Sequence, residues 1–163
     1  MKIATPFGPA WAAINKAGAV TAFGFGETTR HADPDSSGSS PELARQLDEF
    51  FAGTRAQFDV PLAAKGSDFQ KRVWEELRRI PVGQSISYAE LAKRVGRPGA
   101  ARAVGRANAT NPIALLVPCH RVIGSGGKLT GYAYGVELKE KLLNWEKSEN
   151  RFEQAAKLRN LGA

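Results

Sequence analysis

The sequence predicts an α+β fold, with a small antiparallel sheet and one helix at the N-terminus and a mainly helical C-terminal part. The first 30 residues alternate apolar with small or polar positions, which is typical of short strands. From about residue 67 onwards, apolar side chains recur instead at helical spacing. The 163 residues, 42% of them hydrophobic and 24% charged, have ordinary globular composition and suffice for two small domains. We therefore predict a division into residues 1–66 and 67–163.

The N-terminal part is predicted to contain strands, a loop, a helix and a linker. Tight turns are expected at the glycines of the strand region, which are Gly8, Gly18, Gly24 and Gly26. The polar run 31–40 is expected to be a surface loop. Ser40 is a plausible N-cap with Pro41 at the first helical position, and the helix that follows ends near Gly53. Its apolar face consists of Leu43, Leu47, Phe50 and Phe51. Residues 54–66 are predicted to be an extended linker.

The C-terminal part contains several helix signals in succession. Ser67 and Gln70 have capping-box spacing ahead of a helix that ends near Pro81. Its apolar positions are Phe69, Val73, Trp74 and Leu77. Ser87 and Glu90 repeat the capping pattern and open a short helix through residue 95, followed by a turn at 96–99 and a helix over 100–109. Two short helices around a glycine-containing turn predict a helix-turn-helix.

Positive charge is concentrated in the C-terminal part. The net charge of the chain is +7, but residues 1–66 hold 6 basic and 7 acidic residues, whereas residues 67–163 hold 17 and 9. Between residues 83 and 128 there are 7 basic residues against Glu90 alone. These are Lys93, Arg94, Arg97, Arg102, Arg106, Arg121 and Lys128. This distribution favours a nucleic-acid partner, with a plain solvated basic face as the alternative.

Several classes of protein are excluded by composition. A single cysteine forms no internal disulfide and no multi-cysteine zinc site, so we expect no metal. The longest aliphatic stretch, residues 113–117, is far shorter than the roughly 20 residues that span a bilayer. The N-terminus carries no secretion-signal pattern, so we expect a cytoplasmic protein without membrane contact.

The only cysteine lies in the most specific part of the sequence, where Pro118 is followed by Cys119, His120 and Arg121. A thiol with an ordinary pKa of about 8.5 needs a base or a positive field to react at neutral pH. His120 is the candidate base, acting through a water because neighbouring residues seldom hydrogen bond directly. The base in turn needs an orienting carboxylate. The predicted helix 137–147 offers Glu146, Glu137 or Glu140, and spacing alone does not choose among them.

These motifs together resemble the signature of the O6-alkylguanine-DNA alkyltransferases. The resemblance rests on Asn111-Pro112, the block 118–123, Gly131-Tyr132 and the Lys139, Leu142, Leu143 and Glu146 pattern. Matches at 69–70, 73–74, 80–81, 83, 87–88, 91–92 and 100–105 follow in the family's order. The match is dense over residues 67–147 and loose over residues 1–66. It implies a ribonuclease-H-like N-terminal domain and a C-terminal domain that binds DNA and accepts the alkyl group.

The resemblance also implies roles for single residues. Cys119 resembles the alkyl acceptor, His120 the water-mediated base, and Glu146 the carboxylate that orients it. Asn111 resembles a hinge residue, and Tyr88 the tyrosine that helps to rotate the nucleotide and donates a proton as guanine leaves. DNA contacts are implied for Ala100, Ala101, Arg102, Arg106 and Arg121, with Arg102 as the finger that fills the emptied base stack. The substrate pocket is implied to include Pro118, Val122, Tyr132, Ala133 and Tyr134.

The implied activity is DNA repair by a single-use (suicide) methylated-DNA–protein-cysteine S-methyltransferase without cofactors. The implied partner is double-stranded DNA with alkylated guanine, and the protein is expected to be a monomer. Alkylated thymine as a substrate and cooperative binding on DNA stay open. Tyr134 departs from the glycine that the family more often has, so the range of accepted alkyl groups is open too. A cysteine hydrolase and a non-enzymatic lesion binder or regulator are the alternatives.

Overall fold

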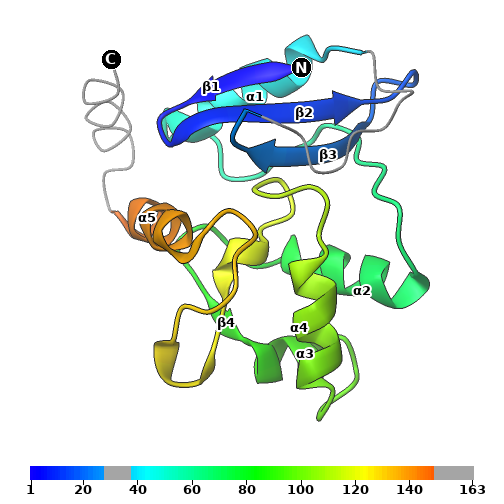
Figure 1. Cartoon of the computed structure of the whole chain (residues 1–163), viewed down its shortest axis with the longest axis vertical. Coiled ribbons are helices and arrows are strands. Elements are labelled where there is room, and N and C mark those ends of the chain that lie inside the picture. Colours follow the sequence, from blue (N-terminus) through cyan, green and yellow to red (C-terminus); the bar gives the residue numbers. More distant parts are fainter. Residues whose placement is uncertain (28–37, 149–163) are drawn as a thin grey trace.

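The computed structural model describes residues 1–27 and 38–148, and its secondary structure is the predicted α+β type (Figure 1). Figure 1 shows the N-terminal sheet and α1 at one end of the molecule and α3 and α4 at the other. His31, most of the predicted loop 31–40 and nearly all of the C-terminal tail, which we expect to be a polar amphipathic helix, lie outside the described residues. Within the described part of the chain, no helix is long and apolar enough to cross a membrane.

The N-terminal sheet consists of β1 (Lys2–Thr5), β2 (Gly8–Ile14) and β3 (Val20–Phe25), paired antiparallel in that order. Lys2 pairs with Trp11 across the first hairpin, and Ala12 pairs with Phe23 across the second. Helix α1 (Pro41–Phe51) begins where predicted, because the Ser40 hydroxyl accepts a hydrogen bond from the Leu43 amide at 3.1 Å. Its predicted apolar face is buried against the sheet.

The C-terminal helices also begin at their predicted caps. Helix α2 (Asp68–Leu77) has the full capping box of Ser67 and Gln70, and α3 (Tyr88–Arg94) is capped by Ser87. Helix α4 (Ala101–Ala109) packs against both α2 and α3. The Trp74 indole on α2 donates to the Ala107 carbonyl on α4 at 2.8 Å, which fixes the two helices together. Helix α5 (Val136–Lys147) completes this part.

Short elements hold the cysteine between these helices. A one-turn 3-10 helix, η1 (Cys119–Arg121), leads into β5 (Val122–Ile123), which pairs in parallel with β4 (Ile86–Ser87). A second 3-10 turn, η2 (Ser125–Gly127), follows in the loop before α5.

The N-terminal sheet supports the segment that leads to the cysteine. On the outer edge of β3, the Phe23 amide donates to the Pro112 carbonyl at 3.0 Å, and the Ala114 amide donates to the Phe23 carbonyl at 3.1 Å. Buried side chains from both halves of the chain form one continuous apolar cluster that includes Phe23, Leu77 and Leu142. The edge strand of the sheet therefore holds the backbone of residues 112–114 in place.

Candidate active site

Asn111 folds the chain into the turn that presents Cys119. Its Nδ2 donates to the Val117 carbonyl at 2.8 Å, and its Oδ1 accepts from the Ile113 amide at 3.0 Å. The whole segment from residue 111 to residue 120 is buried. Leu115, near the middle of the segment, has a φ of 68°, a left-handed conformation that costs a bulky residue of the order of 1–3 kcal/mol. The surrounding contacts therefore force this turn into one shape.

Cys119 is 7% exposed, and burial raises the pKa of its thiol. A hydrogen bond from the Asn111 side chain and the charge of Lys139 act in the opposite direction but do not outweigh burial. Burial therefore favours the protonated thiol in the protein without DNA. The sulfur must lose its proton as part of the reaction, so a base close to it becomes more important.

His120 and Glu146 form the predicted base and orienter. His120 is fully buried, and its Nε2 lies 2.9 Å from Oε1 of Glu146. Burial alone would raise the pKa of Glu146, but the charges and hydrogen bonds of His120 and Arg121 lower it to about 2. Glu146 is thus an anion at neutral pH, and its partners select it from the three candidate carboxylates, because Glu137 and Glu140 are exposed. His120 Nδ1 is buried without a hydrogen-bond partner among the described residues.

Arg121 is a member of this cluster. Its Nη2 lies 2.5 Å from Oε2 of Glu146, and its Nη1 donates to the Ile80 carbonyl at 2.7 Å. The side chain is 6% exposed. This position contradicts the expectation that Arg121 contacts DNA, because the guanidinium is buried and already paired. Its role is to share the Glu146 carboxylate with His120 and to hold that carboxylate ionised.

Lys139 is a second buried residue with a positive charge. It is fully buried, and its Nζ donates to the carbonyls of Val122 at 2.6 Å and of Thr130 at 2.9 Å. Burial lowers the pKa of Lys139, whereas the neighbouring Cys119 raises it. The lysine thus connects α5 to both ends of the loop between Val122 and Thr130. It also places a positive charge near the sulfur of Cys119.

Two tyrosines from the loop before α5 face the site. The Tyr132 hydroxyl is buried without a hydrogen-bond partner among the described residues, and burial, together with Cys119, raises the pKa of Tyr132 well above its ordinary value. The Tyr134 ring packs edge-on against Tyr132 at 5.6 Å and against Phe25 of β3 at 5.8 Å. A Cβ on Gly24 would lie 2.3 Å from the Tyr134 hydroxyl oxygen, so only glycine at residue 24 leaves room for this contact.

The other predicted pocket residues differ in exposure. Pro118 and Val122 are buried next to the cysteine turn, while Ala133 is exposed. Of the residues named here, Cys119 and Tyr134 are the ones that lie close to Tyr132.

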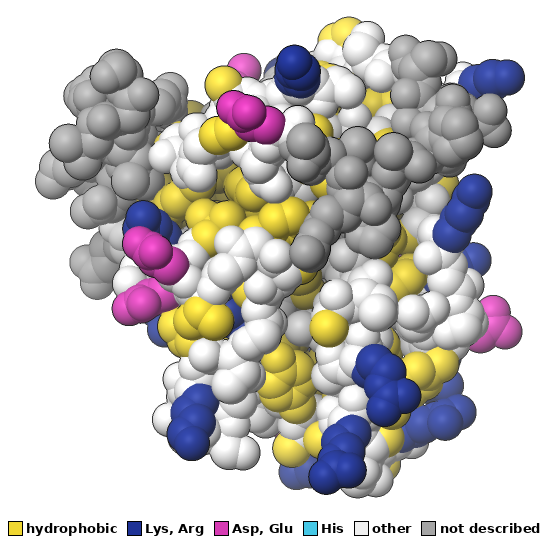
Figure 2. Space-filling view, viewed as in Figure 1, with side chains coloured by type: hydrophobic (Ala, Val, Ile, Leu, Met, Phe, Trp, Pro, Cys, Tyr) yellow, Lys and Arg dark blue, Asp and Glu magenta, His cyan; other side chains and the backbone are white. Residues whose placement is uncertain are grey.

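Helix α4 presents a slim, positively charged face. Arg102, Ala103 and Arg106 are exposed, and Ala100 and Ala101 are partly exposed. Figure 2 shows Lys and Arg side chains gathered at the end of the molecule where α3 and α4 lie. The Tyr88 ring packs beside α4, where a Cβ on Gly105 would lie 3.6 Å from the ring. Tyr88 is therefore a packed residue at the start of α3 that keeps part of its surface exposed.

Comparison with known proteins identifies the family. A family model described as 6-O-methylguanine DNA methyltransferase, DNA binding domain, matches residues 68–148. A methylated-DNA–protein-cysteine methyltransferase of Methanosarcina acetivorans is 57% identical over 107 residues, which cover 66% of this chain and 69% of the relative. The chain belongs to the O6-methylguanine DNA methyltransferase family.

Other members of the O6-methylguanine DNA methyltransferase family extend the similarity. The methylated-DNA–protein-cysteine methyltransferase of Mycobacterium bovis is 54% identical over 118 residues, covering 72% of this chain and 71% of the relative. The crystal structure of Mycobacterium tuberculosis OGT in complex with DNA matches with a TM-score of 0.80 at 44% identity and covers 96% of both chains. The predicted resemblance is confirmed, and the structural match, at 96% of the chain, extends into the N-terminal part, where the sequence resembles the family only loosely.

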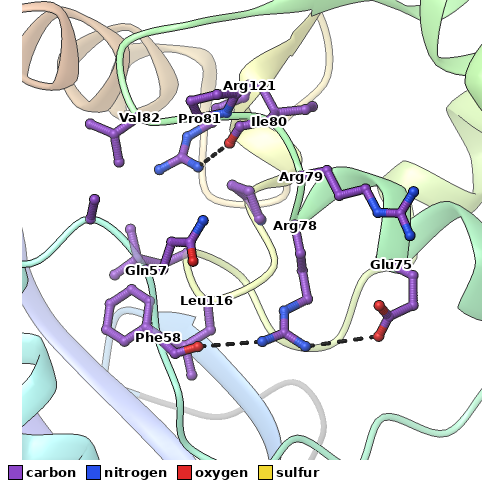
Figure 3. Close-up of a pocket in the computed structure, with 13 residues that line it drawn as sticks. Gln57, Phe58, Glu75, Arg78, Arg79, Ile80, Pro81, Val82, Leu116 and Arg121 are labelled. Atoms are coloured by element: carbon purple, nitrogen blue, oxygen red, sulfur yellow. Dashed lines mark hydrogen bonds and ion pairs between the residues drawn. The ribbon is translucent and has the colours of Figure 1, made fainter.

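A cavity of about 310 Å³ lies beside the cysteine turn of this methyltransferase (Figure 3). It is lined by residues 56–58 of the linker, the end of α2 and the residues up to Val82, and by Leu115, Leu116, Pro118 and Arg121. In Figure 3, Arg78 reaches between the Phe58 carbonyl and Glu75, while Arg121 reaches the Ile80 carbonyl. Its lining includes neither Cys119 nor His120, so we do not assign it to the alkyl group.

Proposed function

We propose that this protein repairs DNA by moving a methyl or other alkyl group from O6 of guanine to the sulfur of Cys119, once per molecule. The observation that carries the proposal is the buried Cys119, His120 and Glu146 arrangement within a member of this methyltransferase family. A base with a free Nδ1 and a carboxylate held ionised on its Nε2 is the arrangement that a buried thiol needs.

The chemistry balances with the thiol and the alkylated base alone. His120 takes the thiol proton through a water, and the Glu146 anion stabilises the imidazolium that forms. The sulfur then attacks the alkyl carbon, the S–C bond forms, the C–O bond breaks, and guanine leaves with the electron pair and takes up a proton. We assign that proton transfer to Tyr88, which regains a proton from solvent while the imidazolium of His120 releases the thiol proton to solvent, so the net reaction moves the thiol proton to guanine. The product thioether has no good leaving group and the chain has no second thiol, so the reaction stops after one turnover.

DNA recognition in this proposal uses α3 and α4 as a helix-turn-helix. Because the alkylated oxygen lies inside a paired duplex, the nucleotide must be flipped out, at a cost of a few kcal/mol. The small side chains at Ala100 and Ala101 suit close approach of α4 to the minor groove. Arg102 fills the emptied stack, Arg106 contacts phosphate, and Tyr88 helps to rotate the nucleotide.

The same proposal includes the expectations about assembly and substrate range. The protein acts as a monomer on double-stranded DNA in the cytoplasm, and O4-alkylthymine and cooperative binding are the points to test next. Residues 1–66 form the ribonuclease-H-like domain that supports the site, and the domain after residue 66 carries DNA binding and alkyl transfer. Pro118, Val122, Tyr132, Ala133 and Tyr134 form the substrate pocket.

Substitution of Cys119 separates this proposal from its alternatives. Cys119→Ala is expected to bind a duplex containing O6-methylguanine with unchanged affinity and to accept no methyl group. A cysteine hydrolase would instead turn over an ester many times in the wild-type protein. If Cys119→Ala removed the methyl group from the duplex as the wild type does, Cys119 would not be the acceptor.

A further inference from the structure

Asn108 makes a direct hydrogen bond from the DNA-facing helix to the reactive residue. It lies near the end of α4, is 4% exposed, and donates from Nδ2 to the carbonyl oxygen of Cys119 at 3.3 Å. Asn111, just beyond the helix, bonds the carbonyls of residues 113 and 117. The two asparagines therefore have different targets, and Asn108 is the one that holds the backbone of Cys119.

The surroundings of Asn108 indicate that its side chain does more than fill space in the core. The carbonyl acceptor fixes the orientation of the amide, since only the NH₂ group can face it. The Oδ1 atom is then buried without a hydrogen-bond partner among the described residues. An unsatisfied polar atom costs of the order of 1–3 kcal/mol, and an apolar side chain of the same size would avoid this cost. The amide is thus placed here in spite of that cost, and its donor has a defined target.

The position of Asn108 on α4 allows this bond to transmit a movement of the helix to Cys119. Arg102 and Arg106 are exposed on the same nine-residue helix, whereas Asn108 is on its buried side. The Trp74 bond to the Ala107 carbonyl, next to Asn108, joins α2 to α4, so the two helices move together. A shift of the helix on the DNA therefore moves the Asn108 donor and, through it, the Cys119 carbonyl.

We propose that Asn108 is a positioning residue that couples the seating of α4 on DNA to the orientation of Cys119. This inference rests on the proposed function, because it requires α4 to contact DNA. It predicts that loss of the Asn108 amide lowers the rate of transfer from a duplex. The rate of transfer from the free base should hardly change, because the free base makes no contact with α4.

Asn108→Leu tests the coupling, because leucine has a similar size and no donor. Single-turnover methyl transfer is measured from an O6-methylguanine duplex and from free O6-methylguanine. We expect the duplex rate constant to fall by about 10-fold, the scale of one lost hydrogen bond, with duplex affinity and the free-base rate unchanged. Asn108→Asp, which turns an acceptor toward the carbonyl, is expected to give the same loss and decides the matter if Asn108→Leu does not fold.

Val104→Ala is the matched control. Val104 is fully buried on the same helix, so its truncation should lower the melting temperature and leave the ratio of the two rate constants unchanged. A wild-type ratio in both Asn108 variants, or an equal fall in Val104→Ala, would overturn the inference. Failure of the proposed function has a different signature: the wild type would accept no methyl group from the duplex, or Arg102→Ala would bind and react with the duplex as the wild type does.

Discussion

Replacing Glu146 with glutamine tests how the buried cluster is held together. Glu146 is the shared partner of His120 and Arg121, and it is 4% exposed. The amide keeps the size of the side chain but removes the negative charge, so Arg121 is left buried with an uncompensated charge. We expect Glu146→Gln to be less stable than the wild type at pH 7 and to transfer methyl about 100-fold more slowly, because the base loses its orienting anion.

The magnitude follows from the pKa of Glu146. Its value of about 2 in the folded protein lies below the ordinary value of 4.5, because His120 and Arg121 outweigh the effect of burial. A carboxylate with a lowered folded pKa contributes stability above its unfolded pKa, and this contribution is lost as the pH falls toward the folded pKa. The difference between these two pKa values corresponds to about 3 kcal/mol in the free energy of unfolding. This stability is present at pH 7 and is lost between about pH 5 and pH 2.

Urea unfolding of both proteins at pH 7 and at successively lower pH measures this contribution. The gap between wild type and Glu146→Gln should be largest at pH 7 and close as the pH falls. Glu137→Gln is the control, because the Glu137 side chain on the same helix is 84% exposed, and we expect it to match the wild type throughout. A gap that stays constant from pH 7 to pH 3 would refute the reasoning.

Three further predictions concern single side chains. Lys139→Met should shift the pH profile of Cys119 alkylation by iodoacetamide to higher pH, because the lysine charge lowers the thiol pKa, and an unshifted profile would contradict this. Tyr134→Gly should raise transfer from an O6-benzylguanine duplex relative to O6-methylguanine on the order of 10-fold, since it removes a ring packed on Tyr132; equal ratios would exclude Tyr134 as a limit on size. Arg106→Ala should reduce the slope of log affinity against log salt by about 1, as expected for one lost phosphate contact, and an unchanged slope would count against that contact.

Local signals predicted the ends of the helices well. Ser40, Ser67 and Ser87 all cap helices in the structure, because a side-chain oxygen at the N-cap satisfies an amide that the helix leaves free. The apolar spacing of α1 and α2 likewise predicted their buried faces. These features depend on neighbours within a few residues, which the sequence displays directly.

The site residues that were mispredicted or missed depend on contacts between distant segments. Arg121 carries a surface-like charge, and only the approach of Glu146 and the Ile80 carbonyl shows that it is buried. The signal that could have identified Lys139 as buried is its place on the apolar face of α5, three and four residues before Leu142 and Leu143. Asn108 carried no such signal.

The thiol of Cys119 illustrates the same limit for electrostatics. The sequence suggested a base or a positive field beside the sulfur, but His120 and Arg121 both bond the Glu146 carboxylate instead. Burial then dominates the pKa of Cys119, a quantity that depends on the packing of the whole segment 111–120.

The central claim is that Cys119 is the acceptor of the alkyl group, and mass spectrometry tests it most directly. The intact protein is weighed after incubation with an excess of duplex containing a single O6-methylguanine, and its peptides are then mapped. The account predicts that each molecule gains the mass of one methyl substitution, located on residue 119, with unmodified guanine left in the duplex. An unchanged mass with the lesion still present, or a methyl group on any other residue, would contradict it.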